Sequence, residues 1–271
     1  MGKKIDLHTH SYYSDGTSSP SEVVQRAAKK GVELLCLSDH DTTTGLEEAA
    51  QEAKKRGMEF IGGIEINTGE SDQIHILGYG IDSWNEGLKK RLEDFRQRRL
   101  GRIRDILQKL KASGVAIDFE DIQAVSRETL GRPHVADALV RRRIVHTRQE
   151  AFQKYLVHGR AGYVEPRGPS TLEAIEVIRE SGGVAVLAHP GIIQDGNMNL
   201  GKWTEQGLGG IEAYYLSHTA HLRQELLEKA EKFSLVPTGG SDYHGPGTGR
   251  EEIGGVEVPE EVYERVLAFR R

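Results

Sequence analysis

Short apolar runs alternate with helical patterns along most of this chain, and several of these runs end in a histidine or a carboxylate. Helical patterns at 20–30 and 45–56 follow the first two runs. Strands that alternate with helices are typical of a parallel sheet with helices packed outside it. Seven runs therefore predict an irregular α/β barrel. The expected strands are 4–7, 32–37, 60–66, 74–79, 184–188, 210–215 and 235–238.

The middle of the chain departs from this alternation. Between residues 85 and 162, apolar residues recur at helical spacing and no strand pattern appears. We therefore expect a barrel domain of residues 1–84 and 163–271, with residues 85–162 as a small all-helical insertion domain that covers the active site. The expected helices of the insertion extend to about 112 and then cover 119–125, 135–142 and 148–158.

Composition narrows the class of protein. A chain of 271 residues can bury a large core without disulfides. Its single cysteine, Cys36, lies in an apolar run, which predicts a small buried side chain in a reducing compartment. No apolar stretch reaches the roughly 20 residues of a membrane span, and no signal-peptide pattern opens the chain. We expect a cytoplasmic protein, a monomer, with no membrane partner.

The charge distribution gives no general footprint for duplex DNA, because 41 acidic residues outnumber 36 basic ones and the net charge is −5. A local basic run lies between Arg96 and Arg104. It could attract a polyanion, but Glu93, Asp94 and Asp105 dilute it. The favoured interpretation is the solvated face of an amphipathic helix. The run consists of Arg96, Arg98, Arg99, Arg102 and Arg104.

The first expected strand carries a candidate metal-binding pattern. Asp6, His8 and His10 are spaced by two, so an extended backbone places them on one face while Ile5 and Leu7 face the other way. Two imidazoles on one face can bind one metal ion. Taken alone, this fragment fits a structural role equally well.

Polar groups also end or interrupt the later strands. A buried imidazole or carboxylate needs a metal, an ion pair or hydrogen bonds. His75 alone would fit a hydrogen-bonded core histidine. However, the carboxyl ends of barrel strands meet at one rim, so residues distant in sequence converge there. The predicted metal ligands are His8, His10, Asp15, His40, Glu65, His75, His189, Asp242 and His244.

Nine nitrogen and oxygen ligands without cysteine suit two or three divalent ions, with Mn, Fe or Zn preferred. Such ions polarise a phosphoryl oxygen and generate hydroxide from bound water, which predicts hydrolysis with metal-bound hydroxide as the nucleophile and no nucleophilic side chain. Asp41 is a candidate for protonating the leaving group or for supporting the site. Metal-bound water is the alternative proton donor.

Four motifs resemble those of the PHP family, the polymerase and histidinol phosphatase superfamily. The resemblance implies a distorted (β/α)7 barrel with a trinuclear site. In that arrangement His8, His10, Glu65 and Asp242 would hold one metal, Asp15, His40 and His244 a second, and Glu65, His75 and His189 a third. Some relatives have His at the position of Asp15, so a dinuclear site stays open. The motifs are His8-Thr9-His10, Ser38-Asp39-His40-Asp41, Ala188-His189-Pro190 and Ser241-Asp242-Tyr243-His244.

Within the family, the chain resembles the branch that dephosphorylates nucleoside 3′,5′-bisphosphates or trims short oligonucleotides from the 5′ end. The segments 131–134, 161–164 and 214–218 carry this resemblance. It implies hydrolysis of nucleotide phosphomonoesters, AMP included, and phosphate binding by Arg132 and His134, with His218 a weaker candidate. A surface ion pair for Arg132 and a helix N-terminus for His218 are the alternatives.

Three other functions stay open. Histidinol-phosphate phosphatase would use the same barrel and metals with a different enclosure of the substrate. A non-catalytic, metal-stabilised module is disfavoured by the full ligand set. A metal-dependent amidohydrolase would begin with the same His-x-His pattern, but no lysine stands at an expected strand end to supply its usual ligand.

Overall fold

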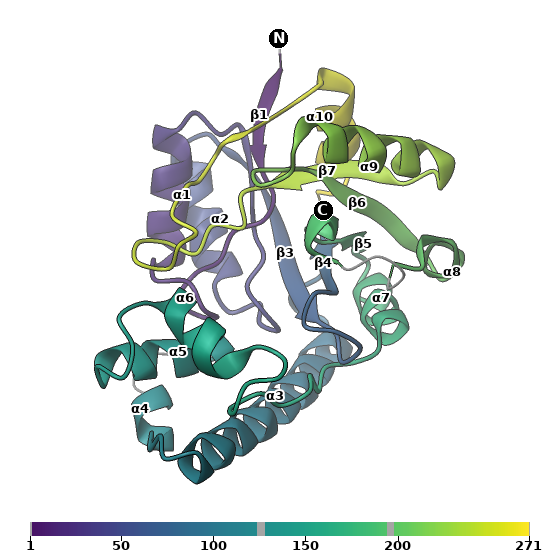
Figure 1. The fold of residues 1–271 in the computed structure, drawn as a ribbon. Coiled ribbons are helices and arrows are strands. Elements are labelled where there is room, and N and C mark those ends of the chain that lie inside the picture. Colours follow the sequence, from purple (N-terminus) through teal and green to yellow (C-terminus); the bar gives the residue numbers. More distant parts are fainter. Residues whose placement is uncertain (1, 124–127, 194–197, 271) are drawn as a thin grey trace.

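An eight-stranded sheet forms the centre of the computed structural model, which describes residues 2–123, 128–193 and 198–270. The amide of Leu7 donates to the carbonyl of Gly239 over 3.0 Å, which joins the first strand to the seventh and nearly closes the sheet. The predicted α/β barrel is thus confirmed (Figure 1). The strands are β1 (Lys3–Asp6), β2 (Leu34–Leu37), β3 (Glu59–Asn67), β4 (His75–Tyr79), β5 (Val184–Leu187), β6 (Leu208–Tyr215), β7 (Val236–Gly240) and β8 (Val256–Val258).

Two strands run against the others, which corrects the expected all-parallel sheet. The β4 strand is antiparallel to both β3 and β5. Only residues 68–74 connect β3 to β4, and a parallel crossover needs about a dozen residues or more. The β8 strand, absent from the sequence prediction, pairs antiparallel with β1. The strand order is β7-β6-β5-β4-β3-β2-β1-β8.

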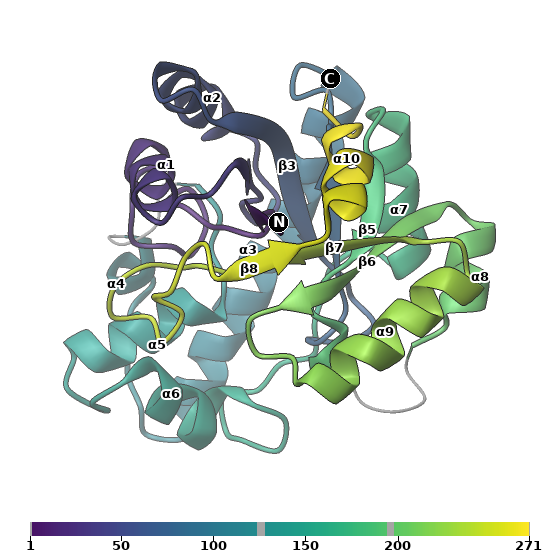
Figure 2. The ribbon, with the colours of Figure 1, turned by 90° about the horizontal axis from the view of Figure 1, so that it is seen from above.

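Helices pack around this sheet, and local capping explains where several begin. Ser19 and Glu22 form a capping box at the start of the first helix, and the Ser170 hydroxyl accepts the amide of Glu173 at the start of another. In Figure 2, α10 lies over the barrel end that also holds the N-terminus. The helices of the barrel are α1 (Pro20–Lys29), α2 (Leu46–Lys55), α7 (Thr171–Glu180), α8 (Leu200–Glu205), α9 (Ala220–Lys232) and α10 (Glu260–Leu267), with a 3₁₀ turn η2 (Pro190–Ile192).

The segment between β4 and α7 forms a helical layer at the opposite end of the barrel (Figure 1). Part of the expected helix 119–125 lies outside the described residues. The expected helix 135–142 begins earlier, at Arg132, because Gly131 is its N-cap residue and Pro133 suits a first turn. Its elements are α3 (Glu86–Ala112), α4 (Phe119–Gln123), α5 (Arg132–Arg141), α6 (Arg148–Ala151) and a π-helical turn η1 (Phe152–Leu156).

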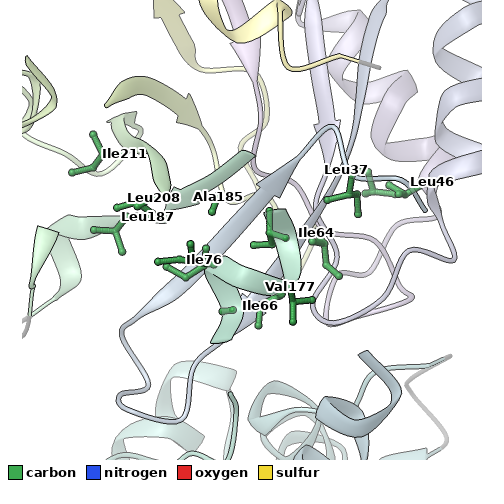
Figure 3. Packing of buried hydrophobic residues seen from close by; sticks show 14 of the residues in the cluster. Leu37, Leu46, Ile64, Ile66, Ile76, Val177, Ala185, Leu187, Leu208 and Ile211 are labelled. Carbon is green, nitrogen blue, oxygen red and sulfur yellow. The ribbon is translucent and has the colours of Figure 1, made fainter. Parts of the chain in front are cut away.

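The α3 helix links two hydrophobic clusters. Near its start, Leu88, Leu92 and Phe95 pack into the cluster between the sheet and its helices, part of which is drawn in Figure 3. Ile103 and Ile106 belong to a separate cluster made with α5 and its neighbours. No helix within the described ranges is both long and apolar enough to cross a bilayer.

Cys36 is expected to resist thiol reagents in the native protein. Its side chain is 0% exposed inside the barrel, and burial, with the nearby Asp6 and Asp39 carboxylates, raises the pKa of the thiol well above its usual value. Ellman's reagent should therefore label no thiol until a denaturant is added. The exposed variant Ala112→Cys should label one thiol at once. Rapid labelling of Cys36 in the native protein would contradict the buried placement.

Candidate active site

The structure brings all nine predicted ligands to the barrel end that faces the helical layer. Most of them follow the carboxyl ends of parallel strands, as His8 and His10 follow β1. His75 is different, because it opens β4. It reaches the same rim because β4 is reversed and pairs His75 with Asn67, the last residue of β3. Because β4 runs in the opposite direction, its first residue, and not its last, lies at the rim with the other ligands.

Glu65 lies at the centre of this cluster and is 1% exposed. Its Oε2 atom lies 3.1 Å from His40 Nδ1, and its Oε1 atom lies 2.8 Å from His75 Nδ1. It is therefore the carboxylate with the most imidazole neighbours in the cluster. The five imidazoles around it are those of His8, His10, His40, His75 and His189, at 2.8–3.2 Å.

Two further carboxylates flank Glu65. Asp242 Oδ1 lies 3.4 Å from His8 Nε2, and also 3.4 Å from His10 Nε2. Asp15 Oδ1 lies 3.2 Å from His244 Nε2, and its Oδ2 lies 3.7 Å from His40 Nε2. Each carboxylate thus faces at least two imidazoles within a buried space.

The donor atoms in this cluster fit divalent cations. Several buried atoms come close together, yet none has a hydrogen-bond partner within the part of the chain that the structure describes. Buried polar atoms rarely stay unpaired, and converging His and carboxylate ligands suit Zn, Mn or Fe. The unpaired atoms are His8 Nε2, His10 Nε2, Asp15 Oδ1, His40 Nδ1, His189 Nδ1 and Asp242 Oδ1.

The ligands divide into overlapping groups. Asp15 belongs with His10, His40 and His244, while Glu65 belongs to two of the other groups. These overlaps agree with a shared, central Glu65. The four groups are His10, Asp15, His40 and His244; His8, His10 and Glu65; His8, His189 and Asp242; and Glu65, His75 and His189.

The carboxylates of the cluster are ionised. Burial alone would raise the pKa of Glu65, but the neighbouring imidazoles of His40 and His8 outweigh it and hold that pKa well below its usual value. For Asp242, burial is again opposed, here chiefly by Arg250, and the pKa falls well below its usual value. Although burial opposes the change, Asp242 and Glu65 raise the pKa of His10 to about 9, so a bound cation would displace a proton from this ring.

A cavity of about 570 Å³ opens above the cluster. His40, His75 and His189 lie on its barrel side. The opposite side comes from the helical layer and is rich in guanidinium groups. Arg99, Arg102, Arg132 and Arg148 line the cavity from the helical layer, Arg167 lines it from the segment before α7, and Arg250 lines it from the barrel, next to Asp242.

Arg132, for which a phosphate contact was predicted, lies in the first turn of α5 and lines this cavity. Its Nη1 atom lies 2.8 Å from Asp72 Oδ2 and donates to the carbonyl of Leu156, and its guanidinium lies over the ring of Phe152. Burial lowers its pKa to about 10, so it stays charged at neutral pH. It is a cation held in place on the wall of the cavity.

Part of the basic run on α3 also lines the cavity, which corrects its interpretation as a solvated face. Arg98 and Arg104 are exposed, but Arg99 and Arg102 are partly buried. Arg99 lies four residues after Phe95 and four before Ile103, both of which are buried. The sequence did contain a signal for Arg99. Its position falls on the apolar stripe of the helix, whereas an arginine in solvent would lie on the opposite, polar face.

His134 and His218 do not line the cavity. His134 is buried, with Nε2 2.9 Å from the Ser14 carbonyl and Nδ1 accepting the Gly131 amide. His218 Nδ1 lies 3.1 Å from the Ala213 carbonyl, and its Nε2 accepts the Gly191 amide. Both ring nitrogens of each histidine thus have backbone partners, so the phosphate contacts predicted for them would require one of these hydrogen bonds to break.

Asp41 is buried behind the cavity wall, 1% exposed. Its Oδ2 atom lies 3.2 Å from Arg99 Nη1. Burial raises the pKa of Asp41 to about 6, and the charge of Arg99 opposes that rise. Asn67 Oδ1 accepts from the same Arg99 nitrogen at 2.6 Å. Asp41 therefore contacts an arginine of the cavity rather than the cavity itself.

Sequence reasoning missed three residues next to the ligands. Glu212 lies fully buried within 3.3 Å of His8. Tyr215 and Arg250 both contact Asp242 Oδ2, the first by a hydrogen bond of 2.9 Å. Glu212 carried a signal, because a carboxylate inside an apolar strand needs buried partners. Tyr215 belongs to the segment 214–218 that carries the family resemblance, although no role was predicted for it, and Arg250 carried no signal.

Comparison with known proteins gives the family. A family model described as the PHP domain matches residues 6–114. A 3′,5′-nucleoside bisphosphate phosphatase of Chromobacterium violaceum is 36% identical over 260 residues, which cover 93% of this chain and 91% of that protein. The chain belongs to the PHP family. This confirms the resemblance drawn from its motifs.

Further relatives of this PHP protein agree. A 5′-3′ exoribonuclease of Haemophilus influenzae is 36% identical over 255 residues, 91% of this chain and 92% of that one. A structure from Bifidobacterium adolescentis, assigned as a metal-dependent phosphoesterase, superposes with a TM-score of 0.90 at 30% identity, over 99% of this chain and 97% of that one. The PHP protein is a hydrolase of phosphate esters that depends on divalent metals.

Removing metal is expected to lower the thermal stability of the protein. A cation at about 100 times its dissociation constant stabilises the folded state by about 2.7 kcal/mol. For a chain of this size, that corresponds to roughly 5–10 °C in Tm. Scanning fluorimetry with excess Mn²⁺ and with EDTA measures the difference, and Asp242→Asn should reduce it. Equal Tm values under the two conditions would contradict a metal site.

Proposed function

We propose that this PHP protein removes phosphate from nucleotides that carry phosphate at two positions, nucleoside 3′,5′-bisphosphates above all. One observation carries the proposal: a single cavity has metal ligands on one side and arginines on the other. A substrate with two phosphates can occupy both sides at once. The name of the Chromobacterium violaceum relative supports this choice of substrate.

The nine predicted residues would hold two or three ions of Mn, Fe or Zn, with Glu65 shared between them. Such ions, when bound, supply an activated water and polarise the phosphoryl group. Donor type supports this assignment, since imidazole and carboxylate groups suit these metals. The reacting phosphate would lie on this side of the cavity, where His40, His75 and His189 are exposed to it.

The second phosphate would lie against Arg99 and Arg132. A guanidinium matches a phosphate with two parallel hydrogen bonds. Asp72 Oδ2 holds one nitrogen of Arg132, while Asp41 and Asn67 hold one of Arg99. These contacts would fix both arginines before substrate arrives. We therefore assign Asp41 to the orientation of Arg99 rather than to proton transfer.

Residues 85–162 would act as a helical domain that covers the active site. Their own hydrophobic cluster supports a separate unit. Arg132, Arg148 and Phe152 line the cavity from this layer. The enclosure would exclude bulk water and strengthen the attraction between arginine and phosphate. A small nucleotide fits this enclosure better than duplex DNA.

Short oligonucleotides with a 5′ phosphate are the second candidate substrates. The similarity to an exoribonuclease favours them.

Phosphate or nucleotide release by the Mn-loaded protein should be measured on adenosine 3′,5′-bisphosphate, AMP, histidinol phosphate and a 5′-phosphorylated trinucleotide. We expect the bisphosphate to give the highest kcat/KM. Preference for the trinucleotide would move the function to exonuclease, and preference for histidinol phosphate would refute the nucleotide assignment.

The test needs a matched pair of histidine variants. His8→Ala removes a ring with 0% exposure from the cluster and should abolish hydrolysis. His221→Ala removes a ring whose side chain is 86% exposed on α9, so the activity should persist. Absence of hydrolysis by metal-loaded protein on all four substrates would overturn the proposed function.

A further inference from the structure

Glu212 has no part in the proposed chemistry, yet it lies at the centre of the barrel. It lies on β6 between Ile211 and Ala213, and all three residues are 0% exposed. A buried carboxylate costs several kcal/mol unless hydrogen bonds or charges compensate it. Its partners therefore indicate what it does.

Both oxygens of Glu212 contact ligands of the proposed metal site. Oε1 lies 3.2 Å and Oε2 3.3 Å from His8 Nδ1. Oε2 also accepts the backbone amide of His189 at 2.7 Å. Gly240 packs against this pair, since a Cβ there would lie 2.4 Å from His8 Cβ and 3.0 Å from Glu212 Oε1. Position 240 on β7 must therefore be glycine, because any side chain there would collide with His8 and crowd Glu212.

The first contact fixes the proton of His8. A carboxylate beside Nδ1 keeps a proton on that nitrogen, so Nε2 is the nitrogen that can give up its proton to a cation. His8 Nε2 points the other way, 3.2 Å from Glu65 Oε2 and 3.4 Å from Asp242 Oδ1, with no hydrogen-bond partner among the described residues. Nε2 therefore faces the other ligands, where a cation would bind.

The second contact fixes the backbone of His189. This residue has φ 27° and ψ 55°, a left-handed conformation that histidine adopts only with support from its surroundings. The hydrogen bond from its amide to Glu212 supplies such support. From this backbone, the ring places Nε2 3.2 Å from Glu65 Oε1. One carboxylate thus orients two ligands that come from different strands.

We propose that Glu212 is a positioning residue of the metal site, which sets its affinity for a divalent cation by orienting His8 and His189 without contacting the cation. The inference rests on the proposed ligand roles of these histidines. It concerns metal binding alone and is independent of the substrate.

The substitution Glu212→Gln tests the proposal. Glutamine keeps the volume, but its single carbonyl oxygen replaces two acceptors, and its NH₂ group would face a donor. We expect the affinity of the metal-stripped protein for Mn²⁺ to fall about 10- to 100-fold, as is usual when the partner of a ligating histidine is lost. Calorimetric titration with Mn²⁺ alone measures this. Glu205→Gln, the same change at an exposed site on α8, should leave the affinity unchanged.

A purely structural role predicts a different result. The Tm of the metal-free Glu212→Gln protein would then fall while its Mn²⁺ affinity stayed at the wild-type value, and that outcome would overturn the proposal. Since no nucleotide is present, failure of the proposed function leaves this test intact.

A second measurement needs no Glu212 variant to fold. Long-range ¹H–¹⁵N correlation spectra of the Zn²⁺-loaded wild-type protein report which ring nitrogen of each histidine carries a proton, and His8→Ala identifies the signals of His8. We expect a proton on Nδ1 of His8. A proton on Nε2 alone would refute the role given to Glu212.

Discussion

Replacement of Glu65 by glutamine is expected to lower kcat/KM for the nucleotide substrate by about a thousandfold or more. Glu65 is in contact with five imidazoles. Metal ions contribute several kcal/mol to stabilisation of the transition state, and each 1.36 kcal/mol corresponds to about tenfold in rate. Glutamine keeps the shape and removes the charge that holds the ions together. Initial rates over a range of Mn²⁺ concentrations measure the loss.

Measuring activity over a range of Mn²⁺ concentrations distinguishes weaker binding of the ions from a loss of activity in the fully metal-loaded protein. If Glu65 binds the ions, very high Mn²⁺ should restore part of the activity, and the Mn²⁺ content of the purified variant should fall. Glu205→Gln, the exposed control, should match the wild type in both measurements. A Glu65→Gln protein with more than a tenth of the wild-type kcat/KM at low Mn²⁺ would refute a bridging role.

Replacement of Arg132 by methionine is expected to affect the two classes of nucleotide unequally. For adenosine 3′,5′-bisphosphate, kcat/KM should fall about 10- to 100-fold, because a hydrogen bond to a charged group contributes about 1.5–3 kcal/mol. For AMP, whose one phosphate occupies the metal side, the change should stay within about threefold. Methionine retains an unbranched stem that can pack on Phe152. Steady-state kinetics on both substrates measure the difference.

The test compares the loss of kcat/KM on adenosine 3′,5′-bisphosphate with the loss on AMP. Arg265→Met, on the exposed face of α10, should alter neither substrate. Equal losses on the bisphosphate and on AMP would show that Arg132 acts at the reacting phosphate. No loss on either would exclude it from substrate binding and leave its contact with Asp72 as a structural ion pair.

Local pattern was sufficient for much of the fold. Alternation of apolar runs with helical patterns predicted the barrel, because side chains on a strand repeat every two residues and those on a helix every 3.6. The same period placed His8 and His10 on one face of the extended segment that follows β1. A group such as Glu65 at the end of a buried strand also needs a partner, so the sequence alone was enough to single it out.

Tertiary structure decided the rest, because it depends on contacts between residues far apart in the chain. Reversal of β4 brought His75 to the rim, and α3 turned Arg99 toward the cavity. His134 and Glu212 gained partners 120 and 204 positions away, at Ser14 and His8. A sequence pattern shows that a buried polar group requires a partner; only closure of the barrel and docking of the helical layer determine which partner lies within hydrogen-bond distance.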